Sequence, residues 1–258
     1  MATECTIAGS DLRVSAEVAA NAATIAAVAR SRGLPVRATV IALATAQQES
    51  RLRNLDHGDR DSLGLFQQRP SQGWGTPEQV RDPVYATNAF YDALVEVDGY
   101  RDLPVTDAAQ RVQRSGFPLA YGDHEPEARL VASALTGYTA GGFSCHLRDL
   151  DPTAESGDDE DASPTAARLL AASRAQVTTA PASVVAGTDG KGLEFAVDGE
   201  EAERIAWAVA GWAVASAATY DVVEVSVNGS RWSRAESGRG WRTTATGVPT
   251  GGVQVRVA

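Results

Sequence analysis

The hydrophobic pattern of this chain changes once, and the change falls at a strongly acidic stretch. Residues 148–161 (RDLDPTAESGDDED) contain seven acidic residues and one arginine, so they offer too little apolar surface to pack. Before this stretch, apolar residues recur at helical spacing; after Leu193 they alternate with a period of two. One domain seldom changes pattern so sharply, so the sequence predicts two separate cores.

The predicted organisation follows from this change. A mainly helical domain is expected over 1–148, and an acidic linker with a short helix near 166–176 is expected over 149–189. A small α+β domain is expected over 190–258, and the predicted fold class of the chain is therefore α+β. A chain of 258 residues is long enough for each part to bury a core.

Capping residues mark the predicted helices of the first domain. Ser15 is a candidate N-cap, and Gly33 is placed to end the same helix. Pro35 suits the first turn of a second helix, whose apolar stripe breaks near residue 53. Asp82 opens a further helix, and Thr106 with the following Asp is expected to cap the next. Residues 56–74 are predicted to form an irregular β-containing loop, and 126–135 a last helix.

The second domain shows strand signals around one apolar helix. Residues 193–197 and 222–227 read as strands, and 200–220 as a helix. Asn228-Gly229 is a strong hairpin signal that places Trp232 on the returning strand. Further strands are expected near Trp241 and over 253–257. The four tryptophans of this part are expected in its core: Trp207, Trp212, Trp232 and Trp241.

Charge and hydropathy exclude some partners. The net charge of −10 argues against nucleic acid, because binding phosphates needs a basic surface. The longest apolar run, 205–218, has 14 residues and is too short to span a bilayer. No charged start followed by an apolar run is visible at the N-terminus, so no signal peptide is predicted within the sequence as written.

The two cysteines, Cys5 and Cys145, leave more than one interpretation open. They are either two buried thiols or a disulfide that ties the N-terminal strand to the end of the first domain. A disulfide would mark an exported protein. A metal site at Cys145 and His146 lacks any recognisable ligand spacing, so neither a metal nor a cofactor is predicted.

Glu49 is the candidate catalytic residue, and it lies at the end of the second predicted helix. Its neighbours at i−3, i−4 and i−8 are Ala46, Thr45 and Ile41. If it faces the core, burial and the helix C-terminus would both raise the pKa of its carboxyl. It would then stay protonated near neutrality, as the general acid of glycoside cleavage must be. The alternative is a solvated glutamate at an exposed helix end.

Two short motifs favour the first interpretation. Glu49-Ser50 is followed by Gly64-Leu65-Phe66-Gln67, and this pair resembles the motifs of lysozyme-like lytic transglycosylases and goose-type lysozymes. The resemblance covers about residues 15–148. It implies that Glu49 is the catalytic acid/base, that Ser50 belongs to the substrate site, that Gly64 lets backbone approach the sugar, and that Gln67 hydrogen-bonds it.

The same resemblance implies a function and a location. The stretch 49–75 is similar to lysozyme-like domains of actinobacterial secreted wall proteins. We therefore expect cleavage of peptidoglycan glycan strands between N-acetylmuramic acid and N-acetylglucosamine, by a lytic transglycosylase or muramidase. The expected location is extracellular or in the cell envelope, with the export segment outside this sequence. The second domain is expected to dock to the wall or to a protein.

One motif departs from the family pattern. The family's third motif is Ala-Tyr-Asn, whereas the closest match here places Gln113 where the tyrosine would be. Related actinobacterial and phage-tail domains carry a Val-Gln-x-Ser-x-Phe-Pro stretch followed by Tyr, matched here by Val112, Gln113, Ser115, Phe117, Pro118 and Tyr121. Gln113 is thus a candidate substrate-binding residue. The alternative function is a catalytically degenerate lysozyme-like protein that binds glycan or a partner.

Other polar and aromatic residues bear on the mechanism. A hydrolase would need Asp56, Asp59 or Asp61 as a second carboxylate, whereas a lytic transglycosylase needs none; turn formation and pairing with arginine is the alternative role. Trp74 either lines a sugar cleft or anchors its loop. The three histidines, His57, His124 and His146, have no partner pattern for a nucleophilic triad.

Overall fold

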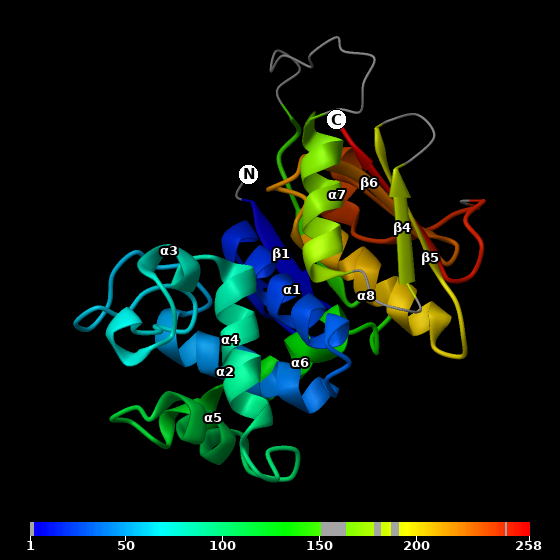
Figure 1. Cartoon of the computed structure of the whole chain (residues 1–258). Coiled ribbons are helices and arrows are strands. Elements are labelled where there is room, and N and C mark those ends of the chain that lie inside the picture. Colours follow the sequence, from blue (N-terminus) through cyan, green and yellow to red (C-terminus); the bar gives the residue numbers. More distant parts are fainter. Residues whose placement is uncertain (1–2, 151–163, 178–181, 187–190, 246) are drawn as a thin grey trace. The chain divides into compact units, whose positions relative to one another are not determined.

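The structure is a computed structural model that describes residues 3–150, 164–177, 182–186, 191–245 and 247–258 (Figure 1). The chain forms two compact units. One is Thr24–Ala132, and the other joins Met1–Ala23 to Ser133–Ala258. Helices and two antiparallel sheets together confirm the α+β fold class.

The unit of residues 24–132 is mainly helical. Its elements are the later part of α1 (Ala16–Ser31), α2 (Val36–Ser50), η1 (Pro70–Gln72), α3 (Pro77–Val80), α4 (Pro83–Val95), α5 (Val105–Gln113), η2 (Ala120–His124) and most of α6 (Glu125–Leu135). In the loop after α2, an isolated β-bridge pairs Leu63 with Gln68. An irregular, β-containing excursion between helices was expected at this place.

The helix boundaries follow the predicted caps with one exception. Ser15 Oγ accepts from the Val18 amide at 3.3 Å, and Asp82 Oδ1 accepts from the Tyr85 amide at 2.7 Å. The predicted cap at Thr106 is wrong. The Pro104 ring fixes φ near helical values, so α5 already starts at Val105, and the Thr106 hydroxyl donates to the Pro118 carbonyl at 2.6 Å.

The other unit contains two antiparallel sheets. The smaller has the order β2-β1-β3, and the larger has the order β4-β5-β9-β6-β7-β8. Helices α7 (Pro164–Gln176) and α8 (Ala202–Ala215) pack against the larger sheet. The strands are β1 (Glu4–Ile7), β2 (Arg13–Val14), β3 (Phe143–His146), β4 (Ala182–Ala186), β5 (Gly192–Val197), β6 (Val222–Val227), β7 (Ser230–Ser233), β8 (Arg242–Thr243) and β9 (Gly252–Val257). A further 3-10 helix, η3 (Arg234–Arg239), follows β7.

The predicted hairpin is present between β6 and β7. Val227 pairs with Ser230, and the two turn residues have φ of 43° at Asn228 and 70° at Gly229. Positive φ at both positions is what a type I′ turn needs. Trp232, on the returning strand, is fully buried. The predicted helix over 200–220 is shorter than expected, since α8 ends at Ala215 and turns connect it to β6.

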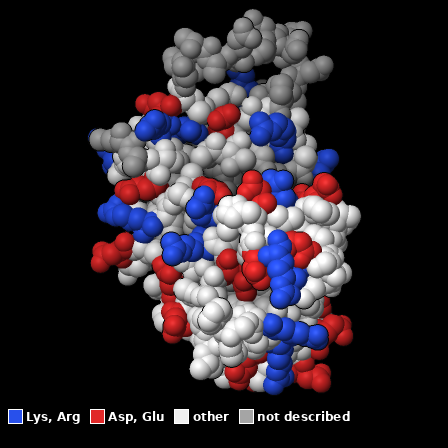
Figure 2. All heavy atoms as spheres, turned by 90° about the vertical axis from the view of Figure 1, so that its left-hand side faces the viewer, with Lys and Arg blue, Asp and Glu red and all other residues white. Residues whose placement is uncertain are grey.

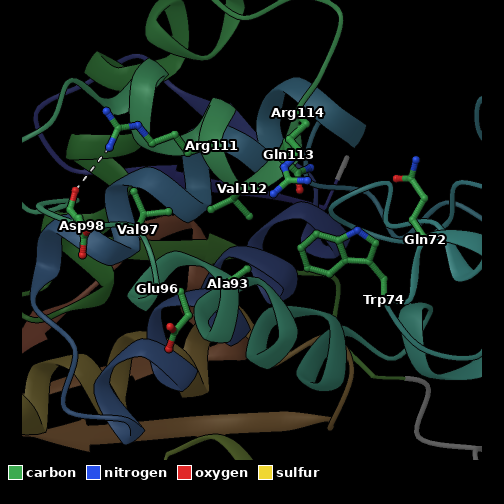
Figure 3. A pocket seen from close by; sticks show the side chains of 10 residues that line it. All are labelled: Gln72, Trp74, Ala93, Glu96, Val97, Asp98, Arg111, Val112, Gln113 and Arg114. Atoms are coloured by element: carbon green, nitrogen blue, oxygen red, sulfur yellow. Dashed lines mark hydrogen bonds between the residues drawn. The ribbon is translucent and has the colours of Figure 1, made fainter.

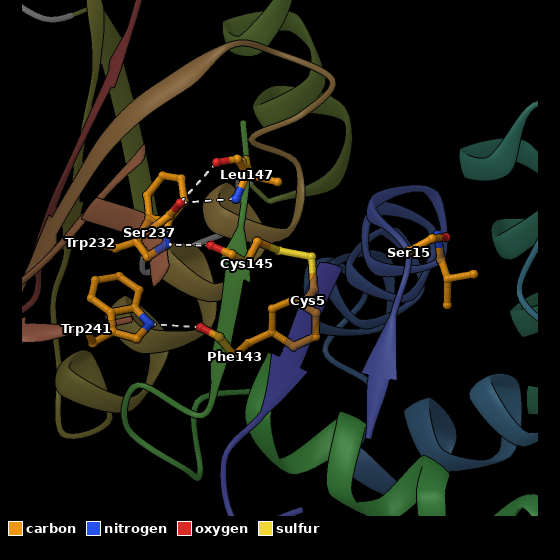
Figure 4. The surroundings of a disulfide bond; sticks show 9 residues. Cys5, Ser15, Phe143, Cys145, Leu147, Trp232, Ser237 and Trp241 are labelled. Carbon is orange, nitrogen blue, oxygen red and sulfur yellow. Dashed lines mark hydrogen bonds between the residues drawn. A yellow bond between two sulfur atoms is a disulfide. The ribbon is translucent and has the colours of Figure 1, made fainter. Parts of the chain in front are cut away.

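A disulfide joins the two cysteines, so two free thiols are ruled out. Cys5 and Cys145 lie opposite each other on β1 and β3, and both are fully buried. Two indole N–H groups donate to the backbone of β3: Trp232 to the Cys145 carbonyl at 3.1 Å and Trp241 to the Phe143 carbonyl at 2.8 Å (Figure 4). Strand β3 is thereby fixed on both sides.

These contacts explain why the units differ from the predicted boundaries. The first domain was expected to end at 148, but residues 133–148 group with the C-terminal part, as do residues 1–23. Helix α7 was expected within a linker, but it contributes to the core, where Trp212 Nε1 donates to Gln176 Oε1 at 2.9 Å. The most acidic part of the expected linker, 151–163, lies outside the described residues.

Two surface properties complete the description. Across the described residues, no helix combines the length and apolarity needed to span a bilayer. On the face seen in Figure 2, acidic and basic side chains are interspersed rather than gathered into fields of one sign.

Candidate active site

The site is built on the last turn of α2. From Ala38 to Ala46 this helix is buried without a break. Thr45 lies one helical turn before Glu49, and its hydroxyl donates to the Ile41 carbonyl of the same helix at 2.7 Å. Glu49 is half-buried, and Ser50 is only 5% exposed. The helix therefore carries a carboxyl group to the edge of the apolar core.

The chain leaves α2 through an unusual turn. Arg51 and Leu52 both have positive φ, 55° and 58°, and the Leu52 amide donates to the Ala46 carbonyl at 3.1 Å. Left-handed backbone costs a non-glycine residue about 1–2 kcal/mol. Leu52 offsets part of this cost because its side chain is buried. The turn directs the following loop back over the helix end.

The Glu49 carboxyl is held by two residues from α5 and η2. The Tyr121 hydroxyl donates to Glu49 Oε1 at 2.6 Å, and the Gln113 side chain also hydrogen-bonds the carboxyl. Burial raises the pKa of Glu49, and the two hydrogen bonds oppose that shift only in part, so the pKa stays above its ordinary value. Burial also raises the pKa of Tyr121, which keeps its hydroxyl protonated as a donor.

Ser50 connects the two sequence motifs inside the protein. Its hydroxyl lies 2.7 Å from the Leu65 carbonyl and 3.1 Å from the Ala46 carbonyl of its own helix. The side chain is buried between these groups. The Glu-Ser motif thus fixes the Gly-Leu-Phe-Gln segment against the end of α2, while a direct contact of Ser50 with substrate stays a prediction.

Gly64 is required by a close backbone approach. Its φ is 75°, and a Cβ atom there would lie 2.1 Å from the Val80 carbonyl oxygen. Its amide donates to the Leu55 carbonyl at 2.8 Å. The close approach in the structure is therefore to the protein's own backbone, and an approach to sugar remains a prediction.

Gln67 and Gln113 both use their amides within the site. Gln67 has a φ of 47° and lies 3.3 Å from each of two carbonyls, those of His57 and Gly64. Gln113 Nε2 donates to the Phe66 carbonyl at 2.7 Å while also contacting Glu49. Gln113 therefore bridges the carboxyl group and the second motif.

Trp74 lines a groove of about 980 Å³ together with Gln113. The groove runs between α4, α5 and the loop after η1 (Figure 3). Its apolar lining is formed by Trp74, Ala93, Val97 and Val112, and its polar lining by Gln72, Glu96, Asp98, Arg111, Gln113 and Arg114. Trp74 was predicted either to line a sugar cleft or to anchor its loop. Its ring lies at this groove, and a contact with sugar stays a prediction.

Two of the three loop aspartates, Asp61 and Asp56, are engaged in the loop itself, whereas Asp59 is exposed and lies 4.0 Å from Arg60 Nε. Asp61 accepts from the Ser71 amide at 2.8 Å and from Arg69 Nε at 3.1 Å, and these contacts lower its pKa to about 2. His57 pairs with Asp56 at 2.7 Å and lowers the pKa of that carboxyl. These contacts fit turn formation and pairing with basic side chains, and they keep both groups ionised.

Two of the three histidines have a side-chain partner. His57 is paired with Asp56 in an exposed loop, and His124 Nε2 lies 2.8 Å from Gln48 Oε1. Within the residues that the structure describes, no group of three or more His, Cys, Asp or Glu side chains could hold a metal ion.

The main site residue that sequence reasoning did not select is Tyr121. It was noted only as part of the stretch that begins at Val112, although its hydroxyl contacts Glu49. The two residues are 72 positions apart, so no local pattern could pair them. The tyrosine ending that stretch was the one available signal.

Left-handed backbone at non-glycine residues is more frequent in the unit of residues 24–132 than in the rest of the described chain. Seven non-glycine residues in the described chain have positive φ, and five lie between positions 51 and 114. These five are Arg51, Leu52, Arg60, Gln67 and Arg114. Such conformations persist where the surroundings enforce them, and they cluster at functional sites. Arg51 and Leu52 directly follow the helix end that carries Glu49, and Gln67 belongs to the second motif, so three of the five adjoin candidate site residues.

Comparisons with known proteins add no assignment. A scan against protein-family models found no match, and a search of curated proteins found none either.

Proposed function

We propose that this protein cleaves peptidoglycan glycan strands between N-acetylmuramic acid and N-acetylglucosamine, with Glu49 as general acid/base. The observation that carries the proposal is the state of Glu49. It is a half-buried carboxyl with a raised pKa that Tyr121 and Gln113 hold, and Gln113 also lines the groove. The Glu-Ser and Gly-Leu-Phe-Gln motifs, which Ser50 joins by a hydrogen bond, support the same family of reactions.

In the first step, protonated Glu49 gives its proton to the glycosidic oxygen as the bond from that oxygen to the sugar C1 breaks. A raised pKa suits this task because it keeps the proton available near neutral pH. The Tyr121 hydroxyl then stabilises the carboxylate that forms, since a hydrogen bond to a charged acceptor is stronger than one to a neutral acceptor.

Of the two possible products, the 1,6-anhydro sugar fits this site better. A hydrolase needs a second carboxylate to activate water or attack C1. Two of the three loop candidates are already engaged, Asp61 with Ser71 and Arg69 and Asp56 with His57. The third, Asp59, is exposed in the loop beside Arg60. In the intramolecular route the substrate's acetamido group supports C1, its 6-hydroxyl attacks C1, and Glu49 takes up the hydroxyl proton. No water is consumed.

This function implies a location and a second task. We infer that the protein acts outside the cytoplasm, in the cell envelope or beyond, because its substrate is there. The buried disulfide supports this inference, since disulfides persist in oxidising compartments. We infer further that the unit containing the larger sheet docks to the wall or to a protein partner.

The deciding experiment compares wild type with Glu49→Gln on purified cell walls. The variant keeps the size and polarity of the side chain but cannot donate the proton, so release of fragments should fall by a factor of about 10²–10⁴. Mass spectrometry of the products should show 1,6-anhydro ends from wild type. Glu127→Gln, on α6, makes the same chemical change away from the groove and should keep full activity.

Two results would contradict the proposal. Undiminished activity of Glu49→Gln would remove Glu49 from the chemistry. Wild-type protein that binds glycan strands without cleaving them would instead support the alternative of a catalytically degenerate binding protein.

A further inference from the structure

The groove beside Gln113 contains more charge than a neutral glycan needs. Glu96, Asp98, Arg111 and Arg114 line it, two of each sign. All four are exposed. A glycan strand is bound by hydrogen bonds and by stacking on an aromatic face, which Gln72, Gln113 and Trp74 already offer. The charges call for a separate explanation.

These four side chains form no ion pair with any of the described residues. The single polar contact is 3.5 Å long, from Arg111 to the backbone carbonyl of Asp98. Some other charges of the same unit are paired, for example Arg37 with Glu125 at 2.9 Å and Arg69 with Asp61 at 3.1 Å. Unpaired charges of both signs around one groove are available to a ligand.

The charges are arranged along the groove in a definite order. Trp74, Gln72, Gln113 and Arg114 lie at one end, and Arg111, Asp98, Val97 and Glu96 lie toward the other (Figure 3). Val112 is buried and Val97 half-buried, which gives the groove an apolar floor. A ligand that fits has a neutral part on Trp74 with a carboxylate near Arg114 beside it. Toward the other end it has a carboxylate near Arg111 and an amine near Glu96 and Asp98.

We propose that this groove binds the peptide branch of a peptide-substituted glycan. The inference rests on the proposed function, and it narrows the substrate from glycan in general to glycan that still carries its peptides. A branch of this kind has free carboxylates and, before cross-linking, a free amine, which matches the two signs of charge. A nucleic acid or another acidic polymer would leave Glu96 and Asp98 facing its negative charges.

The test measures binding rather than cleavage, so it is independent of the catalytic proposal. Three ligands are titrated by calorimetry into the Glu49→Gln protein: a disaccharide with its peptide branch, the same compound acetylated on the free amine, and the disaccharide without peptide. The branched ligand should bind about three- to tenfold more tightly than the acetylated one, since exposed ion pairs contribute modestly. The preference should weaken at high salt.

Variants of the groove test whether Glu96 and Asp98 bind the amine of the peptide branch. In protein that also carries Glu96→Gln and Asp98→Asn, the branched and acetylated ligands should bind equally, because the amine has lost its partners. Asp102→Asn with Asp107→Asn removes the same charge from exposed positions outside the groove lining and should keep the preference. Arg111→Gln with Arg114→Gln should weaken both peptide-bearing ligands and leave the peptide-free disaccharide unaffected.

The outcomes separate the two proposals. Equal binding of all three ligands by protein with an intact groove would overturn the peptide site, whether or not wild type cleaves walls. A preserved preference in the Glu96/Asp98 variant would overturn it as well. Preferred binding of the branched ligand together with no cleavage by wild type would overturn the catalytic proposal alone.

Discussion

Two largely buried helices, α2 and α8, end in different ways. Helix α8 is buried from Ile205 to Ala215 and contains no charged residue over that span. It ends at Ser216 with ordinary backbone, φ −90°. Helix α2 is buried over a similar length but ends with a carboxyl group and two left-handed residues, Arg51 and Leu52. The end of α8 is thus formed by apolar packing, whereas the end of α2 keeps a half-buried carboxyl and left-handed backbone, which both cost folding free energy.

The contrast shows where function can be sought without a motif. Burying a carboxyl and holding non-glycine residues at positive φ both oppose folding. At Glu49 the surrounding hydrogen bonds from Tyr121 and Gln113 maintain such a group, while α8 has nothing comparable. Variants that act on one helix end and not on the other can sharpen or break this comparison.

The largest effect on stability is expected from the disulfide of the unit that contains α8. Cys5 and Cys145 are 140 positions apart, so their link restricts a long loop in the unfolded chain. Replacing both with serine should lower the free energy of unfolding by roughly 4–5 kcal/mol in the chain-entropy model. Urea denaturation of both proteins measures the difference. An unchanged midpoint would mean that β1 and β3 hold together without the link.

Next is Trp212 on α8, which is 2% exposed. Trp212→Ala should cost about 3–5 kcal/mol, because it leaves a cavity in the core. Cleavage below the unfolding transition should remain at the wild-type rate, since every proposed site residue lies in the other unit. If the variant does not fold, Val209→Ala is the milder change. Lost cleavage in a protein that is still folded would argue against two separate roles.

A smaller effect, and the opposite pattern, is expected at Tyr121. Tyr121→Phe removes the hydrogen bond to Glu49 and should reduce cleavage about tenfold with little loss of stability. The hydrogen bond lowers the pKa of Glu49, so its removal should raise that pKa further. The alkaline limb of the pH–rate profile should then move to higher pH. Tyr138→Phe, at an exposed position, is the control and should leave the profile unchanged.

The smallest effect is a pH-dependent stability difference at Glu49. Burial raises its pKa in the folded state, so the unfolded chain releases this proton first as the pH rises above the ordinary value of 4.5. The contribution of Glu49 therefore destabilises wild type as the pH rises, and Glu49→Gln lacks this contribution. The variant should match wild type below that pH and melt at a higher temperature at pH 7. A lower melting temperature of the variant at pH 7 would contradict a costly buried carboxyl.

Local signals in the sequence predicted local structure well. The Ser15 and Asp82 caps and the Asn228-Gly229 turn depend on residues within a few positions of one another, and all three are confirmed. Thr106 shows the limit, because Pro104 competed for the same helix start. The disulfide was one of the alternatives left open, and only the register of β1 with β3 decided it.

Long-range pairing was what the sequence could not supply. The hydrophobic period predicted two cores with a boundary at 148, whereas residues 133–148 group with the C-terminal part, because the tryptophan contacts to β3 come from positions 232 and 241. Glu49 was selected from its helical neighbours, yet its partner Tyr121 is brought to it only by the tertiary fold. Likewise, nothing local indicated that the Ser50 hydroxyl reaches the Leu65 carbonyl.

The chain order of the larger sheet bears on how the protein emerges from the ribosome. Strand β9 is the last of the described strands to be synthesised, yet it lies between β5 and β6 in the middle of the sheet. The strands on either side of β9 therefore cannot join into one sheet until β9 is synthesised. All of residues 24–132 are synthesised much earlier. During synthesis, the unit of residues 24–132 can therefore fold before the unit that contains the larger sheet. Cys5 and Cys145 are both synthesised before β9, so their disulfide can form before the larger sheet is complete.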